Sequence, residues 1–276
     1  MSRQLESGDQ KSALGAGPRL PFPWRGWLAA IIVALVLVWS ANGTGFSFRA
    51  LAEGLPEIQA YLARLLPSAE KPWPLDFLPQ IRDRLAETIR MALGASLVGS
   101  ALALPFALVG ARNLAAGRLV YNIGRGFLNL VRTVPDLILA SLLASIFGIG
   151  PLPGLLALGI FTFGVVAKLL SDTVETIDPG PLEAVTATGG SRLEQAWFGV
   201  LPQIGPDFVA YTLYAFEINV RAAAVVGLVG AGGIGVILDA SIKLFRYGRV
   251  GLIIAATFLV VLLIDSFSTW LRSKLV

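Results

Sequence analysis

The sequence predicts an all-α polytopic membrane protein with six transmembrane helices. Of its 276 residues, 55% are hydrophobic and only 14% are charged, whereas a soluble domain averages about 25% charged residues. So few charges cannot cover a water-exposed surface. Apolar stretches also recur along the chain, and several reach the roughly 20 residues that a hydrocarbon layer about 30 Å thick requires. Together these observations favour a bundle of membrane-spanning helices over a soluble fold.

The chain begins with a polar segment, residues 1–23, which contains Gly, Pro and Ser and has no apolar period. This composition predicts a disordered tail. The next segment, residues 24–42, is apolar and carries no charge after Arg25, so we expect it to form the first transmembrane helix. A cleaved signal peptide is the alternative, but the long preceding tail and the poor cleavage context around residues 39–41 favour a retained anchor.

Residues 43–83 differ from the segments on either side because apolar and polar residues alternate there with a helical period. The pattern predicts an amphipathic helix that lies outside the bilayer or on its surface. The segment Lys71-Pro-Trp-Pro74 ends this pattern. The apolar positions are Leu51, Leu55, Ile58, Leu62 and Leu65, and the polar positions between them are Glu53, Glu57, Gln59 and Arg64.

Residues 84–276 contain the remaining apolar stretches and form the expected core of the bundle. Lys and Arg divide almost equally between the two sides of the membrane that these stretches define, so charge does not fix the orientation. An even number of spans does place both termini on the same side. The expected spans cover residues 84–110, 119–147, 151–172, 203–229 and 249–272.

Several kinds of catalytic site are excluded by composition and motif. The chain has no Cys and no His, which excludes thiolate catalysis, an imidazole base and zinc sites built from Cys. It also lacks a Gly-x-Ser-x-Gly elbow and any Gly-Lys dipeptide, so it has no Walker A loop and ATP chemistry requires another polypeptide. No basic cluster with interleaved aromatic residues indicates a nucleic-acid partner. We therefore expect no catalytic residue, metal or cofactor in this chain.

The segment between the fourth and fifth spans predicts two short helices rather than a span. Asp178 is a good N-cap, and Pro179 fits the first helical position. Gly189-Gly190 ends the first helix, and Ser191-Arg-Leu-Glu194 forms a capping box that begins a second helix reaching about Val200. From capping alone, an ordinary interfacial loop and a docking surface for another protein remain open as alternatives of similar weight.

This segment resembles the signature of ABC importer permeases, which reads Glu-Ala-Ala, three residues, Gly, nine residues, Ile, one residue and Leu-Pro. Val185 stands where the second Ala is usual and Gly199 where the Ile is usual, so the packing is altered while the spacing is intact. In that family the segment is the cytoplasmic coupling helix, which fits a cleft on the ATPase subunit. The matching positions, and the implied ATPase-coupling residues, are Glu183, Ala184, Val185, Gly189, Leu201 and Pro202.

The resemblance implies a type I ABC importer permease-like bundle in the bacterial inner membrane, in contact with its lipid. It places the coupling helices at 178–202 and both termini in the cytoplasm, and residues 43–83 in the periplasm. It also implies a homodimer and two ATP-binding subunits that hold ATP and Mg. A periplasmic or lipid-anchored solute-binding protein would deliver the solute to residues 43–83 and 236–248.

Three further segments resemble the permeases of phosphonate-type importers: Thr176–Ala184, Arg132–Leu137 and Gly227–Gly235. Together they imply the uptake of phosphonate, phosphite or a related phosphorus oxyanion. Methionine importer permeases share the Gly-rich pattern, so another small solute such as methionine or phosphate remains an alternative. A secondary transporter, a less favoured alternative, would predict inverted repeats and ion-coupling carboxylates. An intramembrane enzyme would need a nucleophile and a base, and no such pair is evident.

Several charged residues fall at or near membrane depth, where each costs roughly 2.5–3.5 kcal/mol at the centre of the bilayer. An anionic solute needs positive potential along its path without a tight site. Structural pairing, as between Glu217 and Arg221 at i, i+4, is the alternative. These residues are Arg90, Arg125, Arg132, Asp136, Lys168, Glu217, Arg221 and Asp265.

Pro135 is expected to kink the third span and to free the carbonyl of Val131 beside Arg132. A gate element and a packed kink with an internal Arg132–Asp136 pair are equal alternatives there. The glycines after the fifth span are expected to allow close backbone approach and flexing at an outer gate. The candidate residues of the translocation path or gate are therefore Arg132, Pro135, Asp136, Glu217, Arg221, Gly230, Gly232 and Gly233.

Overall fold

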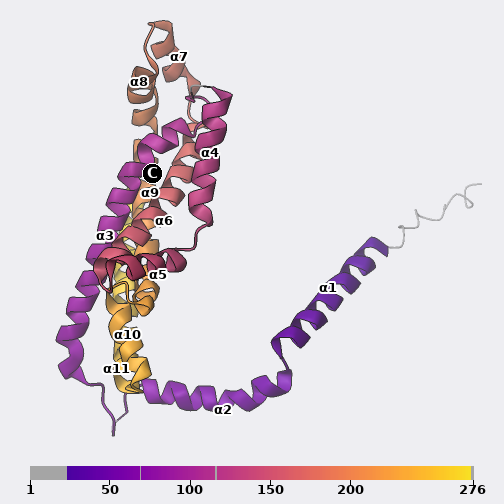
Figure 1. Ribbon diagram of the computed structural model, residues 1–276, viewed down its shortest axis with the longest axis vertical. Helices are drawn as coiled ribbons and strands as arrows, with labels where there is room; N and C mark the ends of the chain where they lie inside the picture. Colours follow the sequence, from indigo (N-terminus) through magenta and orange to yellow (C-terminus); the bar gives the residue numbers. More distant parts are fainter. Residues whose placement is uncertain (1–23, 69, 116, 275–276) are drawn as a thin grey trace, which may run out of the picture. The chain divides into compact units, whose positions relative to one another are not determined.

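The computed structural model describes residues 24–68, 70–115 and 117–274, and the regular structure within these segments is helical throughout (Figure 1). The expected all-α class is therefore confirmed for the described residues. The chain divides into two units, residues 1–61 and residues 62–276, and each is described by itself. The tail expected at residues 1–23 lies outside the described residues.

The N-terminal unit consists of α1 (Trp24–Thr44) and most of α2 (Phe48–Leu65), whose last turn belongs to the second unit. The stretch Gly26–Thr44 of α1 is long and apolar enough to cross a membrane. α2 has the expected amphipathic pattern, and on its polar side Arg49 Nε lies 2.7 Å from Glu53 Oε1. No residue of α2 is buried.

The second unit is a bundle of long helices with shorter elements at its ends. Helix α3 begins at Leu78 rather than at residue 84 because Pro79 fits the first helical turn, where no intrahelical amide bond is lost. The elements are η1 (Leu75–Phe77), α3 (Leu78–Val109), α4 (Arg118–Thr133), α5 (Asp136–Phe147), α6 (Pro151–Val174), α7 (Pro179–Ala187), α8 (Arg192–Glu194), the π-helix η2 (Gln195–Val200), α9 (Leu201–Val226), η3 (Gly227–Val229), α10 (Ile234–Lys243) and α11 (Tyr247–Arg272).

Among the described residues, five helical segments are long and apolar enough to cross a membrane, and a sixth span results if α4 and α5 cross together. These two helices are bent by 80°, so the span expected over residues 119–147 is not one continuous helix. The kink expected at Pro135 is instead a complete break. Val134 adopts an extended conformation with ψ 117°, as the steric conflict with a following proline favours.

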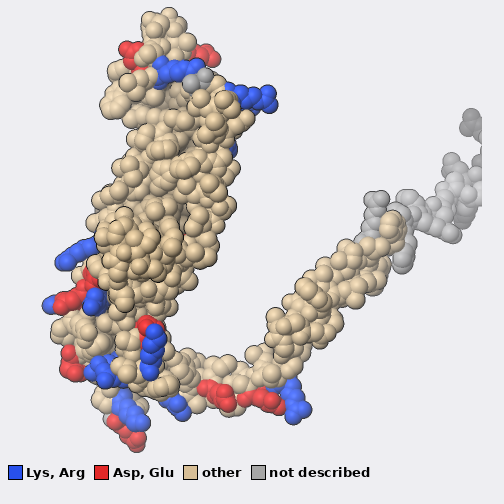
Figure 2. Space-filling view, viewed as in Figure 1, with Lys and Arg blue, Asp and Glu red and all other residues tan. Residues whose placement is uncertain are grey.

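The distribution of charge on the second unit agrees with a membrane-spanning bundle. On the face that Figure 2 shows, Lys, Arg, Asp and Glu gather toward the two ends of the bundle and are sparse in the band between them. An uncharged band is what a hydrocarbon layer requires, because exposed charges are costly inside it.

α3 and α6 pack closely along a seam of small residues. On α3, a Cβ atom added at Gly99 would lie 2.6 Å from the carbonyl oxygen of Gly159 and 2.7 Å from Thr162 Cβ on α6. Small residues let helix backbones approach within a membrane, where van der Waals packing drives association. Buried members of the seam on α3 include Ala92, Ala95, Ser96, Gly99, Ala103 and Ala107.

α9 is joined to this seam by a buried polar contact. Asn219 Nδ2 donates to Ser96 Oγ on α3 at 2.8 Å and to Thr162 Oγ1 on α6 at 2.7 Å. All three side chains are fully buried. Interhelical hydrogen bonds of this kind stabilise membrane bundles, so Asn219 fixes the position of α9 against the α3–α6 pair.

We predict that Gly99→Ala lowers the thermal midpoint of the purified protein in detergent by roughly 2–12 °C. Overpacking a close contact costs about 1–3 kcal/mol, and each kcal/mol shifts the midpoint by about 2–4 °C in a chain of this size. Gly126→Ala is the matched control, because no atom lies within 4 Å of a Cβ there. Equal midpoints for the two variants would contradict a close α3–α6 contact.

Candidate functional site

The segment between α6 and α9 folds as a helical hairpin, residues 178–202, at one end of the bundle (Figure 1). Asp178 caps α7, since its Oδ1 accepts from the Gly180 amide at 2.9 Å. The side chain of Gln203 closes the base of the hairpin, because it accepts from the Asp178 amide at 3.1 Å and donates to the Asp178 carbonyl at 3.2 Å. The cap expected at Asp178 is confirmed.

Gly189 turns the chain between the two arms of the hairpin. Its φ of +81° lies in the left-handed region that favours glycine, and the Gly190 amide then donates to the Val185 carbonyl at 3.0 Å. The capping box of α8 is also confirmed: the Ser191 amide donates to Glu194 Oε2 at 2.6 Å, and the Glu194 amide to Ser191 Oγ at 3.4 Å.

No break separates the second arm of the hairpin from α9. The chain continues from α8 through the π-helix η2, in which the Leu201 amide donates to the Ala196 carbonyl, five residues earlier. A π-turn arises here because Pro202 has no amide hydrogen to offer the Phe198 carbonyl. The continuous helix Arg192–Val229 has 38 residues and is therefore about 57 Å long. Since the hydrocarbon layer is only about 30 Å thick, part of this helix extends beyond it. Arg192 and Glu194 would be costly inside the layer, so we place the first turns of the helix outside it.

Glu194 lies in those projecting turns. Hydrogen bonds from the Ser191 amide and hydroxyl hold the pKa of the Glu194 carboxyl below its ordinary value.

The two departures from the family signature both lie inside the hairpin. A Cβ atom at Gly199 would lie 3.2 Å from Leu182 Cα, so the glycine lets α7 pack directly on η2. Val185 is half-buried and packs against Gly190, where a Cβ would lie 2.6 Å from Val185 Cγ1. By contrast, Glu183 and Ala184 are exposed. Both departures thus lie in the inner packing of the hairpin, apart from the exposed Glu183 and Ala184.

The hairpin also exposes three large apolar side chains that sequence reasoning did not identify. Leu193 is 77% exposed, Trp197 62% and Phe198 64%. Exposed apolar groups that cluster together mark an interaction surface. Their helical spacing is visible in the sequence, but the same spacing continues into an apolar span, which hides the signal. Pro202 is exposed and Leu201 is half-buried at the base of this surface.

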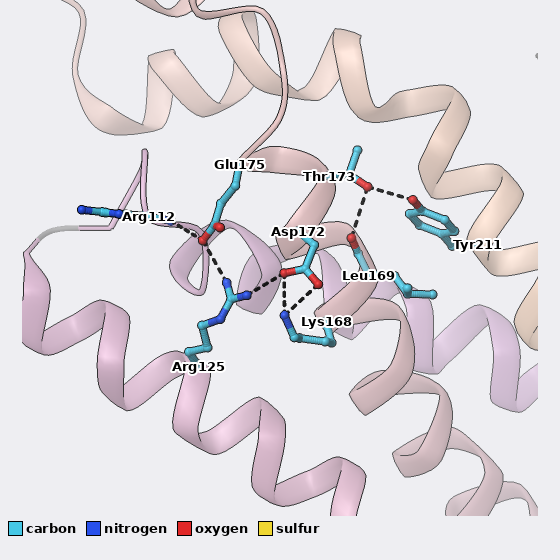
Figure 3. Close-up of polar contacts among 8 residues, drawn as sticks. All are labelled: Arg112, Arg125, Lys168, Leu169, Asp172, Thr173, Glu175 and Tyr211. Carbon is cyan, nitrogen blue, oxygen red and sulfur yellow. Dashed lines mark hydrogen bonds and ion pairs between the residues drawn. The ribbon is translucent and has the colours of Figure 1, made fainter. Parts of the chain in front are cut away.

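Beneath the hairpin, an ion-pair cluster of Arg125, Lys168, Asp172 and Glu175 joins α4 to the end of α6 (Figure 3). Arg125 on α4 binds Asp172 Oδ1 at 2.7 Å and Glu175 Oε1 at 2.9 Å. Lys168 Nζ donates to Asp172 Oδ2 at 2.7 Å. Two of the charges expected near membrane depth, Arg125 and Lys168, therefore form structural ion pairs.

The connection between α3 and α4 links this cluster to the hairpin. Glu175 Oε1 also accepts from the Arg112 amide at 3.0 Å, and Asn113 Nδ2 donates to the Val174 carbonyl at 2.6 Å. On the other side, Arg192 of α8 donates to the carbonyls of Leu114 at 3.1 Å and Ala115 at 2.6 Å. A continuous set of polar contacts thus runs from α8 through this connection to α4.

The candidate path residues on α4 and α5 lie at the break between these helices. Arg132 is exposed in the last turn of α4, and Pro135 is exposed between the helices. Asp136 Oδ1 accepts from the Leu137 amide at 2.9 Å at the start of α5. No Arg132–Asp136 ion pair occurs among the described residues, so the alternative of a packed kink with that pair is wrong.

Glu217 and Arg221 form an ion-pair network with α11. Arg221 pairs with Glu217, whose Oε2 also accepts from Arg272 Nη2 at 2.7 Å. Asp265 lies 3.8 Å from Arg221. The expected i, i+4 pair is therefore part of a larger network. Sequence reasoning missed the role of Arg272 because this residue stands at the end of the last expected span, 55 positions along the chain from Glu217.

The candidate glycines form a turn held by α3. Gly230, Gly232 and Gly233 have φ values of 85°, 86° and 74°. The Gly233 amide donates to Glu87 Oε1 at 3.1 Å, and the next amide donates to Thr88 Oγ1 at 2.8 Å. The described structure thus brings the glycine turn to α3, while Arg132 lies at the α4–α5 break and Arg221 on the α9–α11 face.

Residues 103–276 match the family described as the binding-protein-dependent transport system inner membrane component. The phosphate-import permease protein PhnE of Mycolicibacterium smegmatis is 40% identical over 69% of this chain. The match covers only 36% of the length of that protein. The phosphite transport system permease protein PtxC of Stutzerimonas stutzeri is 36% identical over 80% of this chain and 79% of its own.

A putative cryptic phosphonate transport system permease protein of Escherichia coli is 48% identical to this chain. The match covers 44% of this chain and the whole length of that protein. Among solved structures, an inward-facing MetNI methionine ABC transporter has a similar fold, with a TM-score of 0.63 over 73% of this chain and 98% of that chain. Its sequence identity of 20% supports a likeness of fold alone.

We predict that Arg125→Gln lowers the thermal midpoint in detergent by roughly 2–8 °C, because it leaves partly buried carboxylates short of a cation. Arg118→Gln on the same helix is the matched control, since Arg118 makes no side-chain ion pair or hydrogen bond with the described residues. A loss of the same size in both variants would show that the ion-pair cluster is not what stabilises this end of the bundle.

Proposed function

The chain belongs to the family of binding-protein-dependent transport system inner membrane components, and we propose that it is the permease subunit of an ATP-driven importer of phosphonate or phosphite. Permeases of this family are transport subunits, not enzymes. Three relatives are named for phosphate, phosphite and phosphonate transport, which are all phosphorus oxyanions. The proposal rests on this agreement and on the capped hairpin, whose residues 183–202 have the spacing of the ABC importer permease signature.

In this proposal, the hairpin is the docking element for the partner ATPase. Glu183 and Ala184 are exposed on one arm of the hairpin, and Leu193, Trp197 and Phe198 are exposed on the other arm. An apolar centre with a charged rim is the usual anatomy of a protein interface. The other signature residues act within the hairpin. Gly189 forms its turn, Val185 packs inside it, and its junction with α9 is formed by Leu201 and Pro202.

Movement of the hairpin would reach the membrane by two routes. One route is α9 itself, because the helix from α8 onward is continuous. The other runs from Arg192 to the carbonyls of Leu114 and Ala115, and from there through Glu175 and Arg125 to α4. α4 ends at the break next to Pro135, so a rigid movement of α4 would displace α5 across the bundle. Coupling of this kind is mechanical and needs no covalent chemistry in this chain.

The translocation path is proposed to run along the faces that carry Arg132 and Arg221. The Arg221 side chain is 49% exposed within a span, and an exposed guanidinium at that depth requires water or another protein rather than lipid. A second copy of the chain, packed about a two-fold axis, would supply that environment. The path would then include the α4–α5 break with Asp136, the Glu217 network and the turn at Gly230, Gly232 and Gly233.

The proposed setting is the bacterial inner membrane, with the hairpin and both termini in the cytoplasm. Residues 1–23 would form a cytoplasmic tail, residues 24–42 the first span, residues 43–83 a periplasmic segment and residues 84–276 the permease core. ATP and Mg would be held by two partner ATPase subunits. A periplasmic or lipid-anchored binding protein would deliver the oxyanion, and no nucleic acid takes part.

We predict that Glu183→Lys lowers both ATP-driven uptake and association with the ATPase by at least about tenfold, while the protein still inserts into the membrane. A reversed charge on a docking surface brings like charges together, which costs several kcal/mol, and 1.4 kcal/mol is a factor of ten. Uptake and co-purification of the ATPase are measured side by side. Asp76→Lys is the control, because Asp76 is also exposed but lies before α3. Normal uptake by Glu183→Lys would argue against docking at the hairpin.

For the substrate, we expect the cognate solute-binding protein to bind phosphonate or phosphite tightly, and proteoliposomes holding the complete importer to take up the same anion. Calorimetry on the binding protein and radiolabelled uptake measure the two steps. Tight binding of methionine with no binding of phosphorus oxyanions would overturn the substrate assignment and leave the importer assignment intact. Uptake without ATP would instead favour a secondary transporter.

A further inference from the structure

α2 has one apolar face along most of its length. Around the helix, Arg49, Glu53, Glu57 and Arg64 share the opposite face, as the helical period of 3.6 residues requires. The apolar side chains are each about half exposed, and no residue of α2 is buried. The apolar face consists of Leu51 at 51% exposure, Leu55 at 50%, Ile58 at 49% and Leu62 at 52%.

The first turn of α2 lies close to the end of a membrane span. α1 ends at Thr44, and its stretch Gly26–Thr44 is apolar enough to cross the bilayer. Only three residues, 45–47, join the two helices, and three residues reach at most about 11 Å. The rings of Phe46 and Phe48 pack edge to face at this junction with centroids 5.4 Å apart, and both are exposed.

The last turn of α2 is held against the start of another span. Trp73 Nε1 donates to the Leu65 carbonyl at 2.9 Å. That carbonyl also contacts α11 at Gly251, where any side chain would collide with it. Arg64 lies over the ring of Tyr247, the first residue of α11, with 5.6 Å between the guanidinium carbon and the ring centroid. α11 is itself apolar enough to cross the membrane.

We propose that α2 lies in the plane of the membrane–water interface with its apolar face buried among the lipids. In a chain with six spans, the end of the first and the start of the sixth lie on the same side of the membrane. Both ends of α2 are therefore fixed at one membrane surface, and an 18-residue helix covers about 27 Å along it. An amphipathic helix in this position buries its apolar face about 5–10 Å into the boundary between headgroups and acyl chains.

The occupant of the face is a phospholipid bilayer without a requirement for anionic headgroups. The charged face holds two arginines, Arg49 and Arg64, and two glutamates, Glu53 and Glu57. Because these charges balance, apolar burial rather than electrostatic attraction holds the helix at the surface. The inference needs neither the identity of the solute nor the side of the membrane, so it stands or falls separately from the proposed function.

The test uses single cysteines, which the chain allows without further changes because it contains none. Leu55→Cys and Ile58→Cys place a nitroxide label on the apolar face, and Glu57→Cys and Ala60→Cys are matched controls two residues further along. The full-length protein is reconstituted in nanodiscs of phosphatidylcholine, with or without phosphatidylglycerol. Electron paramagnetic resonance then measures collisions of each label with oxygen, which concentrates in lipid, and with a water-soluble nickel chelate.

We expect the ratio of oxygen to nickel collisions to be several-fold higher at positions 55 and 58 than at positions 57 and 60, and unchanged by phosphatidylglycerol. Equal, water-like ratios at all four positions would overturn the proposal. Protection of positions 55 and 58 from both reagents would also overturn it, since it would show that protein, such as a second copy or a binding protein, covers the face. Size-exclusion profiles that match the unsubstituted protein show that each variant is folded.

Discussion

The close approach of α3 and α6 is the contact on which the rest of the bundle depends. It is possible because Gly99 presents only hydrogen where Gly159 and Thr162 pass, and because small side chains continue the seam on either side. Once the pair is formed, Ser96 and Thr162 come close enough for Asn219 to bind both. That contact positions α9, which in turn carries the hairpin at one end and the Glu217 network along its length. The proposed docking and path elements are thus positioned by a seam that contains none of their residues.

Polar interactions in this chain fall into two kinds with different consequences. The ion-pair cluster around Arg125 links the α3–α4 connection, α4 and α6, so it makes that end of the bundle rigid. Within the described part of the chain, the Glu217 network joins α9 to α11 and leaves half of the Arg221 side chain exposed. In the importer that we propose, a rigid end next to the hairpin would transmit movement from the ATPase, and the more open, charged face along α9 would line the path of the anion.

Much of the fold follows from local chemistry, and the differences have physical causes. The first span, the amphipathic helix and the caps at Asp178 and Ser191 were predictable because each depends on residues close in sequence. The complete break at Pro135 was underestimated, since a proline kinks or ends a helix according to the packing available to the next segment. The roles of Arg272, Glu87 and Trp197 were not predictable, because the partners of the first two lie far away in sequence and the third stands at the edge of an apolar run.

Because the second arm of the hairpin continues through the π-helix at Gln195–Val200 into α9, the number of residues in the signature sets the rotation of the hairpin about the helix axis relative to α9. A single residue in an α-helix turns the chain by about 100° and advances it by about 1.5 Å. One residue more or fewer between Gly189 and Leu201 would leave α9 in place, yet would rotate α7 and the exposed face of Glu183 by more than a quarter of a circle around the helix axis. The number of residues in this stretch therefore sets a phase angle between the span and the surface above it. A phase angle constrains length rather than side-chain identity, which explains how Gly199 can replace a larger residue while the count is kept.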